Sequence, residues 1–242
     1  MAYKLLWQDL FDQEKLNETI WNIETGGHGF GNKENQFYTN QSKNIFIKDQ
    51  ILHIVAHKED YENCHYTSGK LTSRHKKHIQ YGRVEVAAKI PQGRGTWPAI
   101  WFLGENIKEV GWPMCGEIDL MEHVGNNPGY VHFSLHSKEY NHVKQNHPTF
   151  IHRDLNLLDD FHTYFIEWDF GYVTFGIDDQ AIVTFHQEDK LTDAAWPFNQ
   201  PFYLILNLAI GGTWGGAIDD SIFPIEFLIK SVKVYERSDE ID

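Results

Sequence analysis

The sequence is poor in several features, and each shortage excludes a class of protein. Only two of its 242 residues are cysteines, too few for a disulfide framework. No run of eighteen apolar residues occurs, which argues against a transmembrane helix. Lys and Arg number 21 against 34 Asp and Glu, for a formal net charge of −13. This charge, with no basic stripe, argues against nucleic acid or an anionic membrane as partner and, with less force, against sulfated polysaccharides.

The chain also shows no leader, linker, repeat or low-complexity segment. Residues 1–9 (MAYKLLWQD) lack an apolar h-region, so no signal peptide is visible. We expect either a cytoplasmic protein or a chain that follows a removed signal. A length of 242 residues fits one large all-β domain, so we predict a single domain over residues 1–242. Cys115 lies among apolar residues and is predicted to be a buried free thiol, while its pairing with Cys64 stays open.

Alternating and aromatic segments predict strand after strand and hence an all-β sandwich or barrel. A helical pattern is hinted at only over 187–195. We expect a strand over 44–56 ending in a loop at 57–60, and a hairpin of 66–72 with 80–89 across the polar residues 73–77. Further strands are predicted over 96–104, 131–136, 161–169, 172–177, 181–185, 202–210 and 227–237, with a turn at 178–180.

Aromatic residues are abundant, at 14% of the chain with eight Trp, more than a core needs. On a strand, Trp97 and Trp101 share one face. Trp112, between Gly111 and Pro113, and Trp214, among four glycines, lie in loops where a core Trp has little reason to be. Flat aromatic faces stack on sugar rings, so these four Trp residues are candidate substrate-binding residues.

The segment 117–122 (EIDLME) places three carboxylates among apolar residues. In a strand, Glu117 and Asp119 share a face, whereas Glu122 joins them only if a β-bulge inserts one residue. Ile118 and one of Leu120 or Met121 would then enter the core. Glu117 and Glu122 would be about 13 Å apart at their Cα atoms, and inclined side chains could close that gap to the roughly 5 Å of a retaining glycosidase pair. Calcium or magnesium ligands, or a solvated acidic edge, are the alternatives.

These residues resemble glycoside hydrolase family 16, and the flanking segments resemble its laminarinase branch, the endo-β-1,3-glucanases. Seven further segments match in family order across nearly the whole chain. They are 31–39 (GNKENQFYT), 81–86 (YGRVEV), 95–101 (GTWPAIW), 112–116 (WPMCG), 134–136 (SLH), 161–164 (FHTY) and 207–212 (NLAIGG).

The resemblance implies a β-jelly-roll sandwich of two curved antiparallel sheets, with the substrate across the concave face. It implies Glu117 as nucleophile, Glu122 as general acid/base, and Asp119 and His136 beside them. Asn32 and Arg83 match polar family positions and are predicted to bind substrate with Trp97, Trp101, Trp112 and Trp214. The implied reaction is hydrolysis of internal β-1,3-glucosidic bonds with retention of configuration. By family analogy we expect a secreted or periplasmic monomer acting on β-glucan.

The chain departs from the family at a calcium site that many members carry. Leu10 and Lys230 stand where those members have acidic residues. Because a Lys ammonium could replace the charge of the ion, we predict that calcium is absent, with no metal ligands and no cofactor. The segment 137–160 is a second departure, since its His142, His147 and His152 are spaced by five. That spacing fits neither a helical zinc pair nor an alternating strand, so we predict a solvated loop.

Other readings of the resemblance stay open. The bulged motif argues against the lichenases, which use a shorter E-x-D-x-E, although mixed-linkage glucan is still a possible substrate. Agarases and carrageenases share the bulge, but the lead-in 111–116 (GWPMCG) favours laminarin-type glucan. Transglycosylation would use the same glycosyl-enzyme with another acceptor. A non-catalytic β-glucan-binding protein on the same fold would lack the two glutamates, which are present here.

Overall fold

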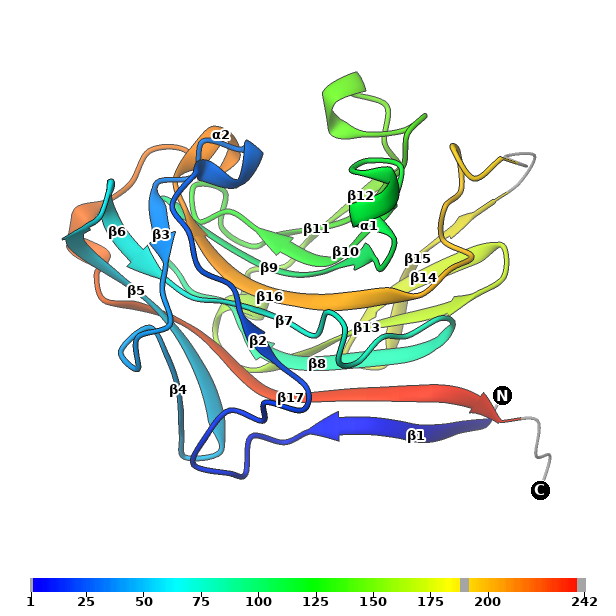
Figure 1. The fold of residues 1–242 in the computed structure, drawn as a ribbon, viewed down its shortest axis with the longest axis horizontal. Helices are drawn as coiled ribbons and strands as arrows, with labels where there is room; N and C mark the ends of the chain where they lie inside the picture. The colour runs from blue at the N-terminus through cyan, green and yellow to red at the C-terminus, as the bar shows by residue number, and fades with distance from the viewer. Residues whose placement is uncertain (1, 188–191, 239–242) are drawn as a thin grey trace.

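The computed structural model describes residues 2–187 and 192–238, and these form two stacked sheets that curve together (Figure 1). Apart from the short parallel pair of β3 and β6, the paired strands run antiparallel, and the arrangement is the predicted jelly-roll sandwich. The outer sheet follows the order β15 (Gln180–His186), β14 (Tyr172–Ile177), β13 (His162–Asp169), β8 (Gly82–Lys89), β17 (Ile225–Ser238), β5 (Ile51–Tyr61), β6 (Cys64–Ser68) and β3 (Gln36–Tyr38), with β1 (Ala2–Asp9) beside β17 and β4 (Ile45–Lys48) beside β5.

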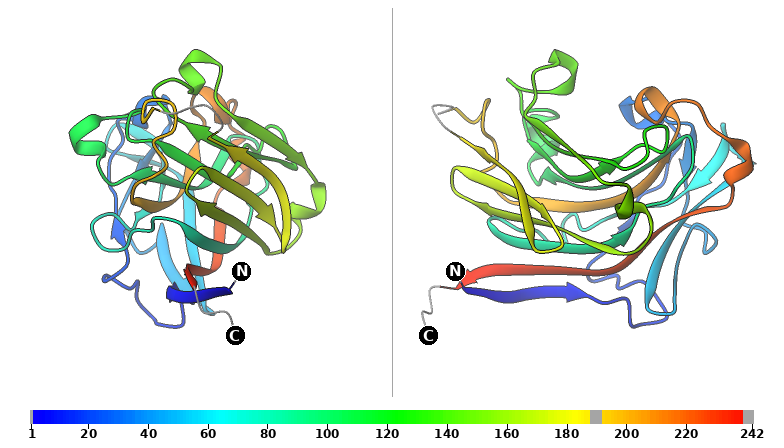
Figure 2. Two further views of the ribbon diagram at one scale, coloured as in Figure 1. Left: turned by 90° about the vertical axis from the view of Figure 1, so that its right-hand side faces the viewer. Right: turned by 180° about the vertical axis from the view of Figure 1, so that it is seen from behind.

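The inner, concave sheet carries the strands on which the site is built. Its order is β12 (Thr149–Arg153), β11 (Tyr130–His136), β10 (Glu117–His123), β9 (Thr96–Gly104), β16 (Phe202–Ile210), β7 (Lys70–Thr72) and β2 (Asn22–Ile23). Short helical segments make up α1 (Ile107–Val110), α2 (Gly212–Gly215), η1 (Gly29–Gly31), η2 (His142–Lys144), η3 (Leu155–Leu158) and η4 (Asp220–Ile222). Seen from behind, the ribbon has the same curvature, and α2 stands at one end of the concave sheet (Figure 2).

The core lies between the two sheets and follows from the period-two alternation of strand side chains. On β8, Val84, Val86 and Ala88 are fully buried, while Arg83 and Glu85 point outward. One hydrophobic cluster joins residues of both sheets, from Phe11 to Val234. Strand β16 is buried along its whole length, because one face meets this core and the other meets the residues of the concave face.

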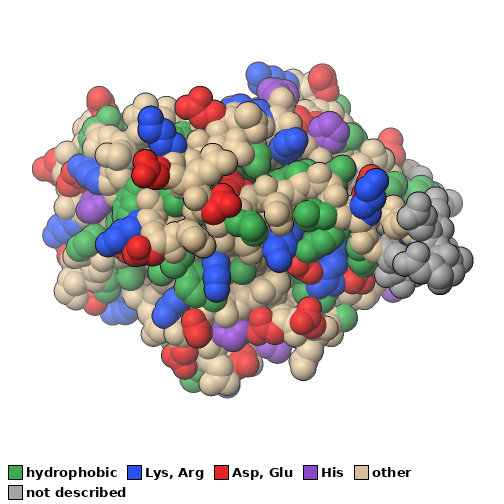
Figure 3. All heavy atoms as spheres, turned by 90° about the horizontal axis from the view of Figure 1, so that it is seen from below, with side chains coloured by type: hydrophobic (Ala, Val, Ile, Leu, Met, Phe, Trp, Pro, Cys, Tyr) green, Lys and Arg blue, Asp and Glu red, His purple; other side chains and the backbone are tan. Residues whose placement is uncertain are grey.

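The opposite, convex side of the molecule has a different character. Figure 3, which views the molecule from below, shows Lys, Arg, Asp and Glu side chains scattered over this face, with both signs intermixed.

No helix of the described residues is long and apolar enough to cross a membrane.

Three predictions about strands and their connections are wrong. Residues 44–56 are a hairpin of β4 and β5, not one strand, and residues 57–60 belong to β5 rather than to a loop. Lys58 pairs with Tyr66 of β6, and charged residues are tolerated there because one face of the strand is open to water. The predicted hairpin across 73–77 is instead a crossover between sheets, since β7 pairs with β16 and β2 while β8 pairs with β13 and β17. Alternation alone does not reveal to which sheet a strand belongs.

The remaining strand predictions are confirmed with small shifts of their ends. Strands β9, β14 and β16 have the predicted bounds. The helix hinted at over 187–195 is absent from the residues of that stretch that are described, which form a turn near Ala195; residues 188–191 lie outside the described part of the chain. Cys64 and Cys115 are both buried free thiols.

Candidate active site

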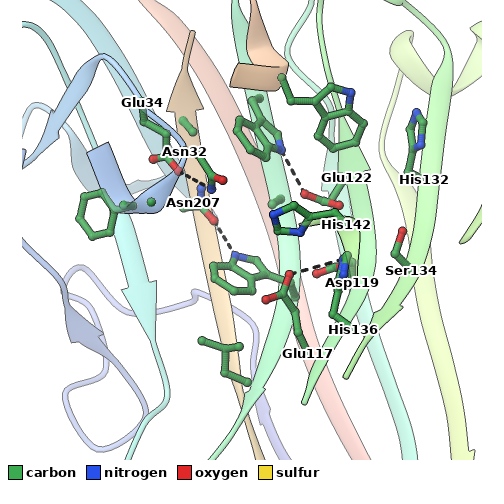
Figure 4. Close-up of a pocket in the computed structure, with 18 of the residues that line it drawn as sticks. Asn32, Glu34, Glu117, Asp119, Glu122, His132, Ser134, His136, His142 and Asn207 are labelled. Atoms are coloured by element: carbon green, nitrogen blue, oxygen red, sulfur yellow. Dashed lines mark hydrogen bonds and ion pairs between the residues drawn. The ribbon is translucent and has the colours of Figure 1, made fainter. Parts of the chain in front are cut away.

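A cavity of about 710 Å³ runs over the concave face, and the acidic strand β10 crosses its middle. Against β11, Asp119 pairs with Ser134 and Glu122 with His132, so the register shifts by one residue between them. This shift is the predicted β-bulge. It leaves both Leu120 and Met121 buried, one more than expected, and turns Glu117, Asp119 and Glu122 to the cavity (Figure 4).

The turn before β10 requires glycine. Gly116 has φ +77°, in the left-handed region that side chains rarely adopt. A Cβ atom at this position would lie 2.9 Å from both Phe202 and Pro197. Only glycine therefore lets the chain pass this close to β16 and deliver Glu117 to the start of the strand.

Glu117 lies at one end of the acidic row and receives a strong donor. The indole Nε1 of Trp112 donates a hydrogen bond of 2.7 Å to Glu117 Oε2. His136, which pairs with Glu117 across the strands, places its Nε2 3.8 Å from the other oxygen, Oε1. Both neighbours favour the ionised carboxylate.

Asp119 and His136 form the centre of the row. Asp119 is 1% exposed, and its Oδ2 lies 3.1 Å from Nε2 of His136, which is 4% exposed. The imidazole therefore stands between Asp119 and Glu117, where its position is set by contacts with both carboxylates.

Glu122 has aromatic neighbours. The indole Nε1 of Trp97 donates a hydrogen bond of 3.1 Å to Glu122 Oε1. The ring of Trp214, on α2, packs edge-on against Trp97 at 5.4 Å and against His132 at 4.8 Å between centroids. These three rings exclude water from one side of the carboxyl group.

Burial governs the protonation of this row. Burial, followed by the charge of Asp119, raises the pKa of Glu117 to about 8. Burial, followed by the charge of Glu117, raises the pKa of Glu122 to about 8. Burial and the charge of Glu122 raise the pKa of Asp119 well above its usual value. Three carboxyl groups this close share protons as a unit, so near neutrality at least one of them is protonated.

One wall of the cavity is a polar network that continues from β9 to β3. Trp101 donates from its indole to Asn207 Oδ1 at 2.7 Å, and Asn207 donates to the hydroxyl of Tyr38 at 3.0 Å. Tyr38 in turn donates to Glu34, which also accepts from Asn32 at 3.4 Å. Asn207 and Glu34 were not predicted as site residues, although both lie within the segments 31–39 and 207–212 that carry the family resemblance.

The opposite wall contains part of the segment 137–160. Most of residues 138–146 are exposed, as the prediction of a solvated loop requires, but His142 and His147 also line the cavity. The ring of His147 stacks on His136 at 4.5 Å, and the ring of His142 meets His136 edge-on at 5.3 Å and Trp112 at 5.1 Å. Burial lowers the pKa of His142, and burial together with the charge of His136 lowers that of His147 to about 4. These side chains are therefore neutral imidazoles packed on the site, which a spacing of five does not suggest.

The structure brings nearly all of the predicted site residues to this cavity. They are Asn32, Trp97, Trp101, Trp112, Glu117, Asp119, Glu122, His136 and Trp214. Arg83 is the exception, and the prediction that it binds substrate is wrong. It lies on β8 of the outer sheet, where its guanidinium group bonds Glu85 at 2.7 Å and Glu167 at 2.6 Å.

Metal ligands are sparse in the described residues. Within 2–187 and 192–238, only Glu117, Asp119 and His136 bring three suitable ligand atoms together. At the calcium position of the resemblance, the carboxylate of Asp9 already accepts hydrogen bonds from Trp21 Nε1 at 2.8 Å and from the backbone N–H of Phe11 at 2.9 Å. Leu10 and Lys230 supply no oxygen ligand from their side chains, so these residues do not fit a calcium ion.

Proteins of known family resemble this chain over nearly its whole length. The chain is 42% identical to a beta-glucanase of Rhodothermus marinus over 96% of this chain and 85% of that protein. It superposes on the laminarinase structure from Rhodothermus marinus with a TM-score of 0.94, at 40% identity, covering 97% of this chain and 98% of the other. For the laminarinase from Flavobacterium sp. UMI-01, the TM-score is 0.90 at 43% identity, covering 96% and 100%. The model of glycosyl hydrolases family 16 matches residues 32–222, and the chain belongs to this family.

Proposed function

We propose that this protein is a retaining endo-β-1,3-glucanase that hydrolyses internal bonds of laminarin-type glucans. The observation that carries the proposal is the bulge in β10, which turns Glu117 and Glu122 to one cavity with Asp119 between them. Two carboxyl groups on one face with differently built surroundings are what double displacement at an anomeric carbon requires.

In the first step, Glu117 attacks the anomeric carbon while Glu122 protonates the departing glycosidic oxygen. The indole donor of Trp112 and the nearby imidazole of His136 favour the ionised form of Glu117 against the effect of burial. Glu122 has a single indole donor and aromatic neighbours, which suits a carboxyl group that holds a proton. In the second step Glu122, now a carboxylate, deprotonates a water molecule that attacks the glycosyl-enzyme and restores Glu117.

Asp119 and His136 would act on the nucleophile. Asp119 raises the pKa of Glu117, and its contact with His136 holds that imidazole beside the Glu117 carboxylate. Trp97, Trp101, Trp112 and Trp214 would form the surfaces on which glucose rings lie, with Asn32 among the polar groups that hydrogen-bond hydroxyls.

The shape of the cavity supports action within a chain. Its lining comes from β3, β7 and η1 on one side of β10 and from β11, β12 and η2 on the other. A polysaccharide can therefore extend in both directions from the cleaved bond. Because such polymers do not cross membranes, we propose that the protein acts outside the cytoplasm, as one catalytic domain spanning residues 1–242.

A substrate panel tests this proposal. Laminarin, lichenan, barley β-glucan, agarose and carrageenan are each incubated with the protein and with its Glu117→Gln variant, and product sizes are followed over time. We expect laminarin to be cut first into mixed oligosaccharides, and the variant to bind laminarin without turnover. Release of a single small product from the start would contradict endo action, and appreciable activity of the variant would refute Glu117 as nucleophile.

A further inference from the structure

A second hollow opens beside the cleft on the same concave face. Its volume is about 530 Å³, and it lies where β2, β7, β9, β16 and α1 meet. Lys70, Leu103 and Ile107 line both the hollow and the main cavity. The two spaces are therefore neighbours, and a side group of a chain lying in the cleft can reach toward the hollow.

The hollow is basic, in contrast to the chain as a whole. Four cationic side chains line it, from Lys70, Arg74, Lys76 and Lys108, against one carboxylate from Glu24. In a chain with a formal net charge of −13, such a local excess of positive charge is conspicuous. It gives this part of the concave face an attraction for anions that the overall charge conceals.

Arg74 brings to the hollow a positive charge that forms no ion pair with a carboxylate of the described residues. Its Nε and Nη2 atoms are buried and have no hydrogen-bond partner among the described residues. The guanidinium carbon lies 5.4 Å from the centre of the Tyr203 ring, which also lines the hollow. Buried charged donors without acceptors are costly, and a planar guanidinium group is matched to the paired oxygens of a carboxylate or a sulfate.

Lys70 links the hollow to the sugar-binding surface. The residue is 7% exposed, and its ammonium group lies 3.2 Å from the carboxylate of Glu24. The same ammonium lies 4.6 Å from the ring of Phe30 and 5.5 Å from that of Trp101, both of which line the cleft. A sugar ring on these aromatic faces would thus have a cation at its edge, on the side of the hollow.

The position of Lys70 along the sheet indicates which sugar of a bound chain would lie beside the hollow. Strands follow the order β10, β9, β16, β7, and neighbouring strands are about 4.8 Å apart. Lys70 on β7 is therefore roughly 14 Å from the catalytic strand. That distance exceeds one sugar ring, so the group bound in the hollow belongs to a residue further along the chain than the ring that is cleaved.

We propose that this hollow binds an anionic substituent, a sulfate ester or a carboxylate, carried by a sugar of the polysaccharide in the cleft. The inference rests on the proposed glucanase function and adds a class of substrate to it: glucans that bear occasional negative charges. Neutral chains remain substrates, because Arg74 and Lys108 lie outside the cavity that holds the carboxyl groups.

Two laminarin preparations test the proposal, one lightly sulfated and one partly oxidised at C6 to the carboxylate. Initial rates on each are compared with those on neutral laminarin for the wild type, Arg74→Gln and Lys108→Gln. Lys108 is exposed on α1, so its variant tests the hollow even if Arg74→Gln fails to fold. Lys230→Gln, an exposed position on β17 of the outer sheet, is the control for loss of one positive charge.

We expect kcat/KM on the anionic chains, relative to neutral laminarin, to fall about tenfold in Arg74→Gln, the size of one lost charge-assisted hydrogen bond, and less in Lys108→Gln. Lys230→Gln should leave the ratio unchanged. An equal ratio in all four proteins would overturn the proposal. Sodium sulfate, titrated by calorimetry and as an inhibitor, separates the two sources of the anion: binding of free sulfate with no preference for sulfated chains would assign the hollow to a free ion and also overturn it.

Failure of the glucanase function would look different. If neutral laminarin were not cut at all, the proposed function would be wrong, while calorimetric binding of the lightly sulfated laminarin to wild type and to Arg74→Gln would still decide the hollow. Weaker binding to Arg74→Gln would support the anion site, and equal binding would refute it.

Discussion

The indole nitrogen of Trp112 donates a 2.7 Å hydrogen bond to Oε2 of Glu117, although Trp112 is 37% exposed and lies outside β10. A residue predicted from its loop position to stack on sugar is therefore also bonded to the proposed nucleophile. The ring of His142 lies 5.1 Å from the same indole. Trp112 thus offers the site two separate groups, its ring face and its N–H group.

Replacing Trp112 with Phe should separate these roles. The ring face is kept but the donor to Glu117 is lost, so we expect kcat to fall about tenfold with a smaller change in KM. Trp112→Ala should in addition raise KM, because the stacking surface is lost as well. Steady-state kinetics on laminarin measure both, with Glu85→Ala on the outer sheet as control. If Trp112→Ala changed kinetics as little as Glu85→Ala, Trp112 would have only a structural role.

Removal of the proposed acid/base should be repairable from outside. Glu122→Ala leaves the leaving group unprotonated and the water unactivated, so the rate should fall by about 10²–10⁴. Azide needs no deprotonation and can enter the vacated space to attack the glycosyl-enzyme. We expect azide to restore turnover of a substrate with an activated leaving group and to give a β-glycosyl azide, identified by NMR. An α-glycosyl azide would rule out the retaining mechanism.

The buried carboxyl groups should make the protein less stable as the pH rises. The pKa of Glu122 is raised to about 8 in the folded state, from 4.5 when unperturbed. Between these values the folded protein holds a proton that the unfolded chain releases, so the free energy of unfolding falls as pH increases through this range. Because glutamine does not titrate, Glu122→Gln removes this loss of stability at high pH. Its melting temperature should exceed that of the wild type by roughly 5 °C at pH 8.5 and match it near pH 4.5.

The exposed Glu14 offers a matched control for that measurement. Glu14→Gln removes the same charge from the surface and should leave the melting temperature close to that of the wild type at both pH values. A Glu122→Gln variant that was destabilised equally at pH 4.5 and pH 8.5 would show that the side chain contributes packing or hydrogen bonding rather than a costly buried charge.

The sequence allowed the centre of the site to be predicted because its geometry is local. The bulge follows from counting positions between Asp119 and Glu122 in a strand, and strand alternation places Trp97 and Trp101 on one face. Arg83 also obeys alternation, but alternation does not tell which of two sheets a strand joins. Its pairing partners on β13 and β17 come from distant parts of the chain, and they turn it away from the cleft.

The periphery of the site was harder to predict for a related reason. His142 and His147 contact His136 because the chain between β11 and β12 bends back over the cleft, a path set by Asn141, whose side chain bonds the backbone of Ser137 and Lys144. Such a loop has no regular spacing of residues from which its path could be predicted. Likewise, the basic hollow depends on Lys70 and Lys108, which are 38 positions apart in sequence and meet only in the folded sheet.

Calcium should have no effect on this protein. Asp9 already bonds Trp21 and Phe11, and neither Leu10 nor Lys230 offers a carboxylate. We expect the melting temperature to be the same in excess chelator and in millimolar calcium. A Lys230→Asp variant would restore one acidic ligand, and its melting temperature should respond to calcium more than that of the wild type. If a chelator lowered the melting temperature of the wild type, the prediction that this protein binds no structural calcium would be overturned.

The stacking of His147 on His136 predicts that a residue outside β10 tunes the reaction. His136 lies 3.1 Å from Asp119, and the parallel ring of His147, at 4.5 Å, holds it there. In His147→Ala the imidazole of His136 gains freedom, so kcat should fall severalfold, whereas His147→Phe keeps a flat ring and should keep most of the activity. His152→Ala, from the same segment but outside the cavity, is the control. Burial lowers the pKa of His147 to about 4, so near that pH a charged ring should repel its neighbours. The loss of activity that this causes lies below the titration of Glu117 and Glu122 near 8, and it should be missing from His147→Phe. If His147→Ala matched His152→Ala in kcat and pH profile, the stack would be packing without consequence for the chemistry.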